Sequence, residues 1–247
     1  VPFSINAQRP VPAKKQVKSI LLIGGTAHIG DGKVIEKSAI GFKDGKITVV
    51  STMAEVDKSA FDETIDITGK QVYPGFIAPN VSLGLVEVGA VRATRDVSEV
   101  GAYNPHVRSL IAYDTDSKII PTVRTNGVLI AQVTPRDGIF SGTSSILELD
   151  GWNWEDAVNK KDDGVHLNWP SVFKRSGWWA EPGPIEKNKD YDNNINAIKK
   201  FIADSKAYNE ATEKTEKNIR FESMKGLFNG AQTLFIHSNF VKEITES

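Results

Sequence analysis

The stretch Asp66-Ile67-Thr68-Gly69-Lys70-Gln71-Val72-Tyr73-Pro74-Gly75-Phe76-Ile77 separates two parts of the chain that have different patterns. Before it, short apolar segments are separated by Asp31-Gly32 and Asp44-Gly45. Asp-Gly supplies the positive φ angles that a tight hairpin turn requires. This pattern predicts short, mostly antiparallel strands over residues 19–75. After the turn at Gly75, Phe76-Ile77 starts a new apolar strand.

Beyond this stretch, strand and helix patterns alternate. A short helix is expected over residues 117–126, closed by Gly127, because glycine commonly ends a helix. The apolar run 128–133 then reads as a buried strand. Strand, helix and strand at this spacing predict an α/β fold class with parallel pairing. The other elements expected are a strand over 146–149, the longest helical stretch over 190–228, a strand over 234–236 that ends at His237, and a helix from Val241.

The composition is that of a globular protein and excludes several classes. Among 247 residues, Lys and Arg number 30 and Asp and Glu number 31, so the net charge is −1. This charge gives no electrostatic reason to expect nucleic acid as a partner. Cysteine is absent, which excludes disulfides, thiolate metal ligands and a cysteine nucleophile. No run reaches the ~18 apolar residues that a membrane span needs.

Residues 1–18 are interpreted as a leader or the remnant of a signal peptide. Ala7 would be the small residue at the cleavage point, so that the mature protein would begin at Gln8. This interpretation predicts a periplasmic or secreted protein. The alternative is an N-terminal segment without a targeting role.

The stretch 66–77 resembles the entry to the barrel in metal-dependent amidohydrolases, especially the imidazolonepropionase-like branch. The turns at 31–32 and 44–47 resemble that family's N-terminal β-sandwich segment. Residues 234–237 resemble its later strand that ends in a metal-binding histidine. The resemblance implies a partial (β/α)₈ TIM barrel over 76–247, preceded by a small β-sandwich segment over 19–75. It also implies hydrolysis of non-peptide carbon–nitrogen bonds in a small-molecule substrate, with a divalent metal such as zinc.

A whole barrel takes about 250 residues, which is more than residues 76–247 provide. We therefore expect the first part of a barrel. The partner that completes it would be the remainder of the same protein or a paralogous subunit, and a homo-oligomer stays open.

The metal motif of this family is altered here. After Phe76-Ile77 the family has Asp, any residue, His, any residue, His, whereas this chain has Ala78-Pro79-Asn80-Val81-Ser82. Asn80 and Ser82 therefore stand where two histidine ligands are expected. Their neutral oxygens are poor zinc ligands, so this metal position is predicted to be lost. Two interpretations stay open: a metal-dependent hydrolase, and a catalytically degenerate homologue that acts as a structural or binding subunit.

By the same resemblance, His237 is a candidate metal ligand. The alternative is a hydrogen-bonded histidine at a strand end. The other histidines, His28, His106 and His166, form no paired ligand motif.

Arg92 and Arg95 follow the first barrel strand, and loops after barrel strands lie on the active-site face. They are candidates for holding a substrate carboxylate, with a solvated charged loop as the alternative. All five tryptophans fall between Trp152 and Trp179. This grouping indicates either a satellite core under an insertion or an aromatic binding surface.

Overall fold

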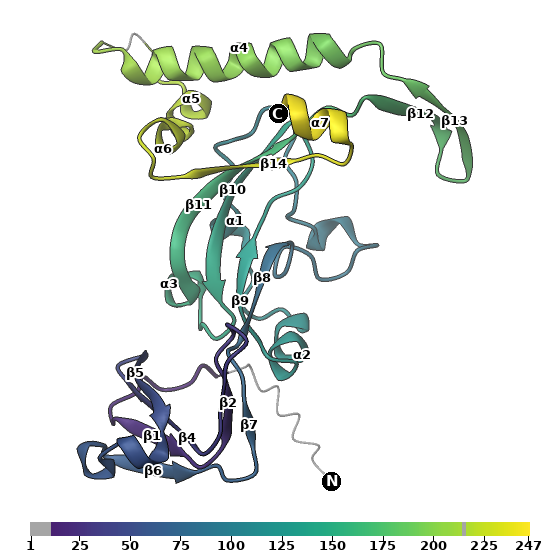
Figure 1. Cartoon of the computed structure of the whole chain (residues 1–247). Coiled ribbons are helices and arrows are strands. Elements are labelled where there is room, and N and C mark those ends of the chain that lie inside the picture. Colours follow the sequence, from purple (N-terminus) through teal and green to yellow (C-terminus); the bar gives the residue numbers. More distant parts are fainter. Residues whose placement is uncertain (1–10, 214–215) are drawn as a thin grey trace, which may run out of the picture. The chain divides into compact units, whose positions relative to one another are not determined.

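The computed structural model of the protein describes residues 11–213 and 216–247. The described chain forms two compact units, residues 11–76 and 77–247 (Figure 1). The cleavage point expected at Ala7 lies outside the described residues. No helix among those described is long and apolar enough to cross a membrane.

The N-terminal unit consists of two small sheets, with strand orders β5-β4-β1-β6 and β3-β2-β7. Its turn at Asp44-Gly45 has positive φ at both residues (51° and 71°), as the Asp-Gly pattern predicts. Pairing is antiparallel except for β1–β6 and β2–β7, which are parallel. The elements are β1 (Ile20–Ile23), β2 (Thr26–His28), β3 (Val34–Ile35), β4 (Ser38–Lys43), β5 (Lys46–Thr52), η1 (Met53–Glu55), η2 (Lys58–Ala60), β6 (Glu63–Asp66) and β7 (Gln71–Val72).

The second unit is built on a curled five-stranded sheet with the order β14-β11-β10-β9-β8 (Figure 1). Its strands are β8 (Phe76–Val81), β9 (Val128–Val133), β10 (Phe140–Glu148), β11 (Val158–Asn168) and β14 (Thr233–His237). A separate hairpin consists of β12 (Phe173–Trp178) and β13 (Glu181–Lys187). The helices are η3 (Arg92–Thr94), α1 (Ser109–Ala112), α2 (Ile119–Thr125), α3 (Trp154–Ala157), α4 (Tyr191–Glu210), α5 (Ile219–Ser223), α6 (Lys225–Phe228) and α7 (Val241–Glu246).

The sheet is mixed rather than parallel throughout. β10 pairs antiparallel with both β9 and β11, whereas β11 and β14 are parallel. The expected parallel pairing is therefore wrong for β10. The reason is local: β9 and β10 are joined by residues 134–139 without a helix, and a short connection returns the chain antiparallel. The described residues form a curled sheet and not a complete barrel.

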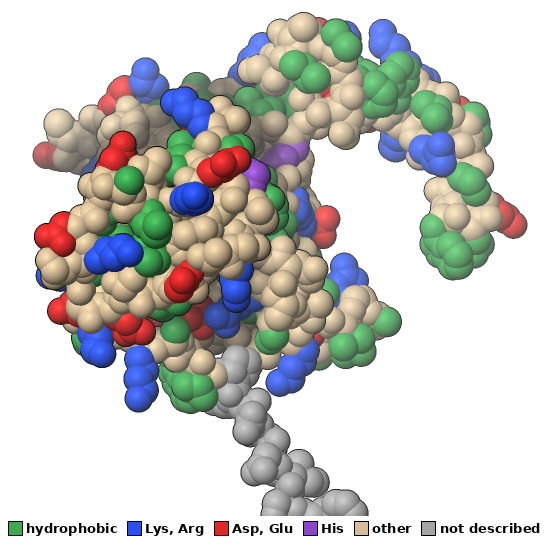
Figure 2. Space-filling model, turned by 60° about the horizontal axis from the view of Figure 1, so that its bottom comes forward, with side chains coloured by type: hydrophobic (Ala, Val, Ile, Leu, Met, Phe, Trp, Pro, Cys, Tyr) green, Lys and Arg blue, Asp and Glu red, His purple; other side chains and the backbone are tan. Residues whose placement is uncertain are grey.

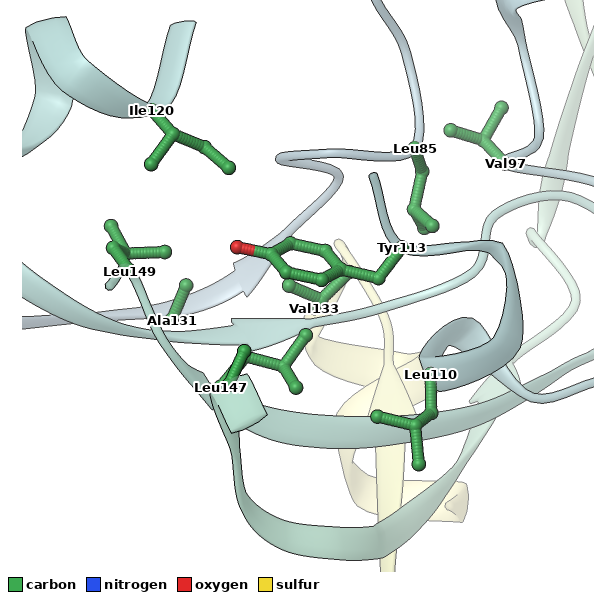
Figure 3. Packing of buried hydrophobic residues seen from close by; sticks show 10 residues of the cluster. Leu85, Val97, Leu110, Tyr113, Ile120, Ala131, Val133, Leu147 and Leu149 are labelled. Atoms are coloured by element: carbon green, nitrogen blue, oxygen red, sulfur yellow. The ribbon is translucent and has the colours of Figure 1, made fainter. Parts of the chain in front are cut away.

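One face of the sheet is covered by helices and apolar side chains. Leu85, Leu110, Tyr113, Val133 and Leu147 belong to one buried cluster, with Tyr113 in its middle (Figure 3). Burial raises the pKa of the Tyr113 hydroxyl. A second cluster packs Val165 and Leu167 of β11 and Leu234 and Ile236 of β14 against Tyr191, Ile195 and Ile198 of α4. Because strand side chains alternate, this packing leaves the intervening residues of β11 and β14 on the opposite face.

Sequence patterns missed β11 and the β12–β13 hairpin. β11 runs through the charged residues 160–163, where two extra residues bulge opposite β10. Asp162 takes up the distortion with φ 49°.

The tryptophans do not form one satellite core. Trp169 is 9% exposed, whereas Trp179 is 89% exposed at the end of the hairpin. Figure 2 shows apolar side chains gathered at this end.

Candidate functional site

The candidate site lies near the carboxyl ends of β8, β9, β11 and β14, and two histidines meet there. Phe235 pairs with His166 and His237 pairs with Asn168 across the parallel β11–β14 ladder. Strand alternation therefore places His166, Phe235 and His237 on one face. The Nδ1 atom of His166 lies 2.8 Å from Nε2 of His237. The two rings are near-parallel, with centroids 5.1 Å apart, and His166 also stacks on Phe235.

Both imidazoles are held in the neutral form. His166 is fully buried, and burial, assisted by His237 and Arg136, lowers its pKa from 6.5 to about 3. Burial and the charge of Arg136 also lower the pKa of His237. In the neutral pair, one ring N–H donates and the facing nitrogen accepts. Among the described residues, Nε2 of His166 is buried without a hydrogen-bond partner.

A fixed guanidinium occupies the other part of the site. Arg136 donates from Nη1 to the side-chain Oδ1 of Asn80 at 2.7 Å and from Nη2 to the Asn80 carbonyl oxygen at 2.5 Å. Asn80 adopts a left-handed conformation with φ 53°, which asparagine tolerates better than most residues. Its backbone N–H donates to Oε1 of Gln132 at 3.2 Å. The positive charge of Arg136 is therefore anchored directly at Asn80.

The buried carboxylate of Asp163, near this site, already has a hydrogen-bond partner and an ion-pair partner. Asp163 accepts from Nε2 of Gln132 at 3.0 Å and pairs with Nζ of Lys160 at 2.6 Å. Next to it, Asp162 accepts two hydrogen bonds of 2.8 Å from Arg108. These contacts fix the bulge of β11 and leave Asp163 neutralised by Lys160. The carboxylate therefore stabilises the sheet rather than offering free ligand oxygens.

The residues at Asn80 and Ser82 do not fit a zinc ion. A bound cation there would face the Arg136 guanidinium, and like charges at short distance in a partly buried site repel strongly. His166 and His237 supply two nitrogens, whereas zinc sites use three or four protein ligands. Within residues 11–213 and 216–247, no three His, Cys, Asp or Glu side chains are grouped to hold a metal.

The other residues singled out from sequence lie apart from this arrangement. Arg92 and Arg95 are exposed, in η3 and at its end, and their role in substrate binding stays a prediction. His28 belongs to the N-terminal unit, where it bonds to Gln71 at 2.7 Å and stacks on Tyr73. His106 is half-buried, and burial lowers its pKa.

Sequence reasoning missed Arg136 and the contact of His166. Arg136 follows β9 by three residues, so its place after a strand of the expected barrel was an available signal. The His166–His237 contact joins residues 71 positions apart. No local spacing motif can reveal such a pair, because the register of β11 and β14 creates it.

Comparisons with known proteins identify the class of fold. An amidohydrolase from Thermotoga maritima MSB8 has a similar structure, with a TM-score of 0.73 and 19% identity over 92% of this chain. This chain spans 60% of that protein's length. The likeness shows that the chain has an amidohydrolase-type fold. A scan of protein-family models finds no match, and neither does a search of curated proteins.

Two further solved structures are similar over a smaller part of the chain. Molinate hydrolase matches 30% of this chain and 16% of its own at 25% identity, with a TM-score of 0.26. A prolidase complexed with N-methylphosphonate-L-proline matches 28% of this chain and 17% of its own at 26% identity, with a TM-score of 0.25. These short likenesses add no information on the site.

Proposed function

We propose that residues 77–247 form a catalytically degenerate amidohydrolase-type half barrel that serves as a binding or structural subunit. The observation that carries this proposal is the pair of hydrogen bonds from Arg136 to Asn80. They anchor a permanent cation where a metal-dependent relative is expected to hold a metal. Fold alone does not define activity, so the changed charge at the site outweighs the likeness of the fold.

A second candidate is the activity implied by the resemblance: metal-dependent hydrolysis of a non-peptide carbon–nitrogen bond in a small molecule. The observation that favours it is the His166–His237 pair at the carboxyl ends of neighbouring parallel strands. In this alternative, further ligands would come from outside the described residues.

Zinc content separates the two candidates. The purified protein is stripped with a chelator, incubated with zinc, desalted and analysed for metal, beside His237→Ala and His166→Ala. The degenerate site predicts far less than one equivalent in all three proteins. Near-stoichiometric zinc that is lost in either histidine variant would overturn this proposal and favour the hydrolase.

The partner proposed for this half barrel is the remainder of the same protein or a paralogous subunit. The sheet order ends at β14 on one side and β8 on the other, and an edge strand offers backbone groups for further pairing. A second copy of the chain is the remaining possibility, which light scattering of the purified protein tests. Export to the periplasm also stays a proposal, and N-terminal sequencing of protein recovered from cells tests it.

A further inference from the structure

A cavity of about 490 Å³ opens beside Arg136. Its walls are mostly apolar: Ala78, Val81, Leu83 and Val86 come from β8 and the segment after it, and Ile119 and Val123 come from α2. These elements are neighbours in Figure 1. Its volume falls in the range of small-molecule sites, which are typically apolar with a few placed polar groups.

Arg136 lines this cavity with donors to spare. Its guanidinium has five N–H donors, and Asn80 receives two of them. Because Asn80 already orients the guanidinium, ligand binding would cost little additional side-chain entropy at Arg136. A planar, fixed guanidinium matches the geometry of a carboxylate.

Glu87 supplies the opposite charge in the same cavity. Its Oε2 accepts from the backbone N–H of Lys118 at 3.3 Å. Its Oε1 is buried and has no hydrogen-bond partner among the described residues. A buried oxygen without a donor is costly, and a ligand that carries a donor would satisfy it.

We propose that this cavity binds a small carboxylate with an apolar body, its carboxylate on Arg136 and a donor such as an ammonium group on Glu87. This inference rests on the proposed function, in which Arg136 takes the place of a metal. The apolar chain of the ligand would lie along the walls from β8 and α2. The exposed Arg92 and Arg95 would have no part in this contact.

Three matched probes test the charge pattern: 6-aminohexanoate, hexanoate and hexylamine. Binding is measured by calorimetry in EDTA, with the protein as purified. We expect 6-aminohexanoate to bind most tightly, hexanoate more weakly and hexylamine least. Arg136→Met should weaken both carboxylates at least tenfold. Glu87→Gln should remove the preference for 6-aminohexanoate over hexanoate and leave hexanoate binding in place.

Arg92→Met is the matched control, because it removes an exposed arginine that does not line the cavity, and circular dichroism checks that each variant is folded. Unchanged binding in a folded Arg136→Met variant, or equal binding of hexylamine and hexanoate, would overturn the inference. Absence of binding to all three probes would also overturn it and leave the proposed function standing. Hexanoate binding that appears only when the EDTA is replaced by zinc would instead contradict the proposed function.

Discussion

The candidate site has two sides that differ in charge. On the β11–β14 side, His166 and His237 are neutral, hydrogen-bonded to each other and stacked. On the β8–β9 side, Arg136 is a permanent cation anchored by Asn80. The two sides are linked, because the charge of Arg136 lowers the pKa of both histidines. The comparison indicates that a fixed cation on one side favours uncharged imidazoles on the other.

The largest expected effect concerns the packing that holds the histidine side in place. Trp169 donates its backbone N–H to the carbonyl of His237 at 2.9 Å and its indole N–H to the Tyr191 hydroxyl at 3.3 Å. It is 9% exposed within the second buried cluster. Trp169→Ala should lower the free energy of unfolding by about 3–5 kcal/mol, measured by urea denaturation.

The matched control is Trp179→Ala, which removes the same side chain at an 89% exposed position. Its effect should stay within about 0.5 kcal/mol. Equal losses in the two variants would mean that Trp169 does not hold this side of the sheet.

The second effect is a pH dependence of the free energy of unfolding, which arises from His166. The pKa of His166 is about 3 in the folded protein and 6.5 as its ordinary value. Between these two pH values His166 binds a proton in the unfolded chain but not in the folded protein. The free energy of unfolding therefore falls as the pH falls. The slope approaches about 1.4 kcal/mol per pH unit.

His166→Gln should flatten this slope, because glutamine does not titrate. Urea denaturation at pH 7, 6 and 5 compares the two proteins. Parallel stability curves would show that His166 is not held neutral by the fold.

The smallest expected effect concerns the influence of the Arg136 charge on the pKa of His237. Arg136→Met removes the guanidinium that lowers the pKa of His237. The pKa of His237, followed by NMR of its ring protons, should therefore rise in this variant. Arg92→Met should leave it unchanged. A pKa of His237 that stays the same in Arg136→Met would break the proposed coupling.

Local signals in the sequence predicted several elements well. The run 128–133 forms β9 over the same residues, and Gly127 follows α2 with φ 86°. Tyr191–Glu210 is the longest helix, in the region where helical spacing was found. These predictions succeeded because backbone geometry and one-sided burial leave a periodic pattern in neighbouring residues.

Other elements carried signals that contradicted their structure. The charged residues 160–163 belong to β11 because Lys160, Arg108 and Gln132 satisfy their carboxylates. Arg108 and Gln132 are 54 and 31 positions away from the carboxylates that they contact, so no local pattern reveals these contacts. The antiparallel direction of β10 was likewise hidden, since it depends on where the chain pairs after residues 134–139.

By itself, the sequence determined the α/β pattern, the division near residue 76 and the neutral, non-imidazole side chains of Asn80 and Ser82 after Phe76-Ile77. Residue identity and short-range spacing are sufficient for these conclusions. Only the tertiary structure decided that Arg136 reaches Asn80 and that His166 meets His237. Both contacts arise when strands far apart in sequence lie in register, and their charges interact through space rather than along the chain.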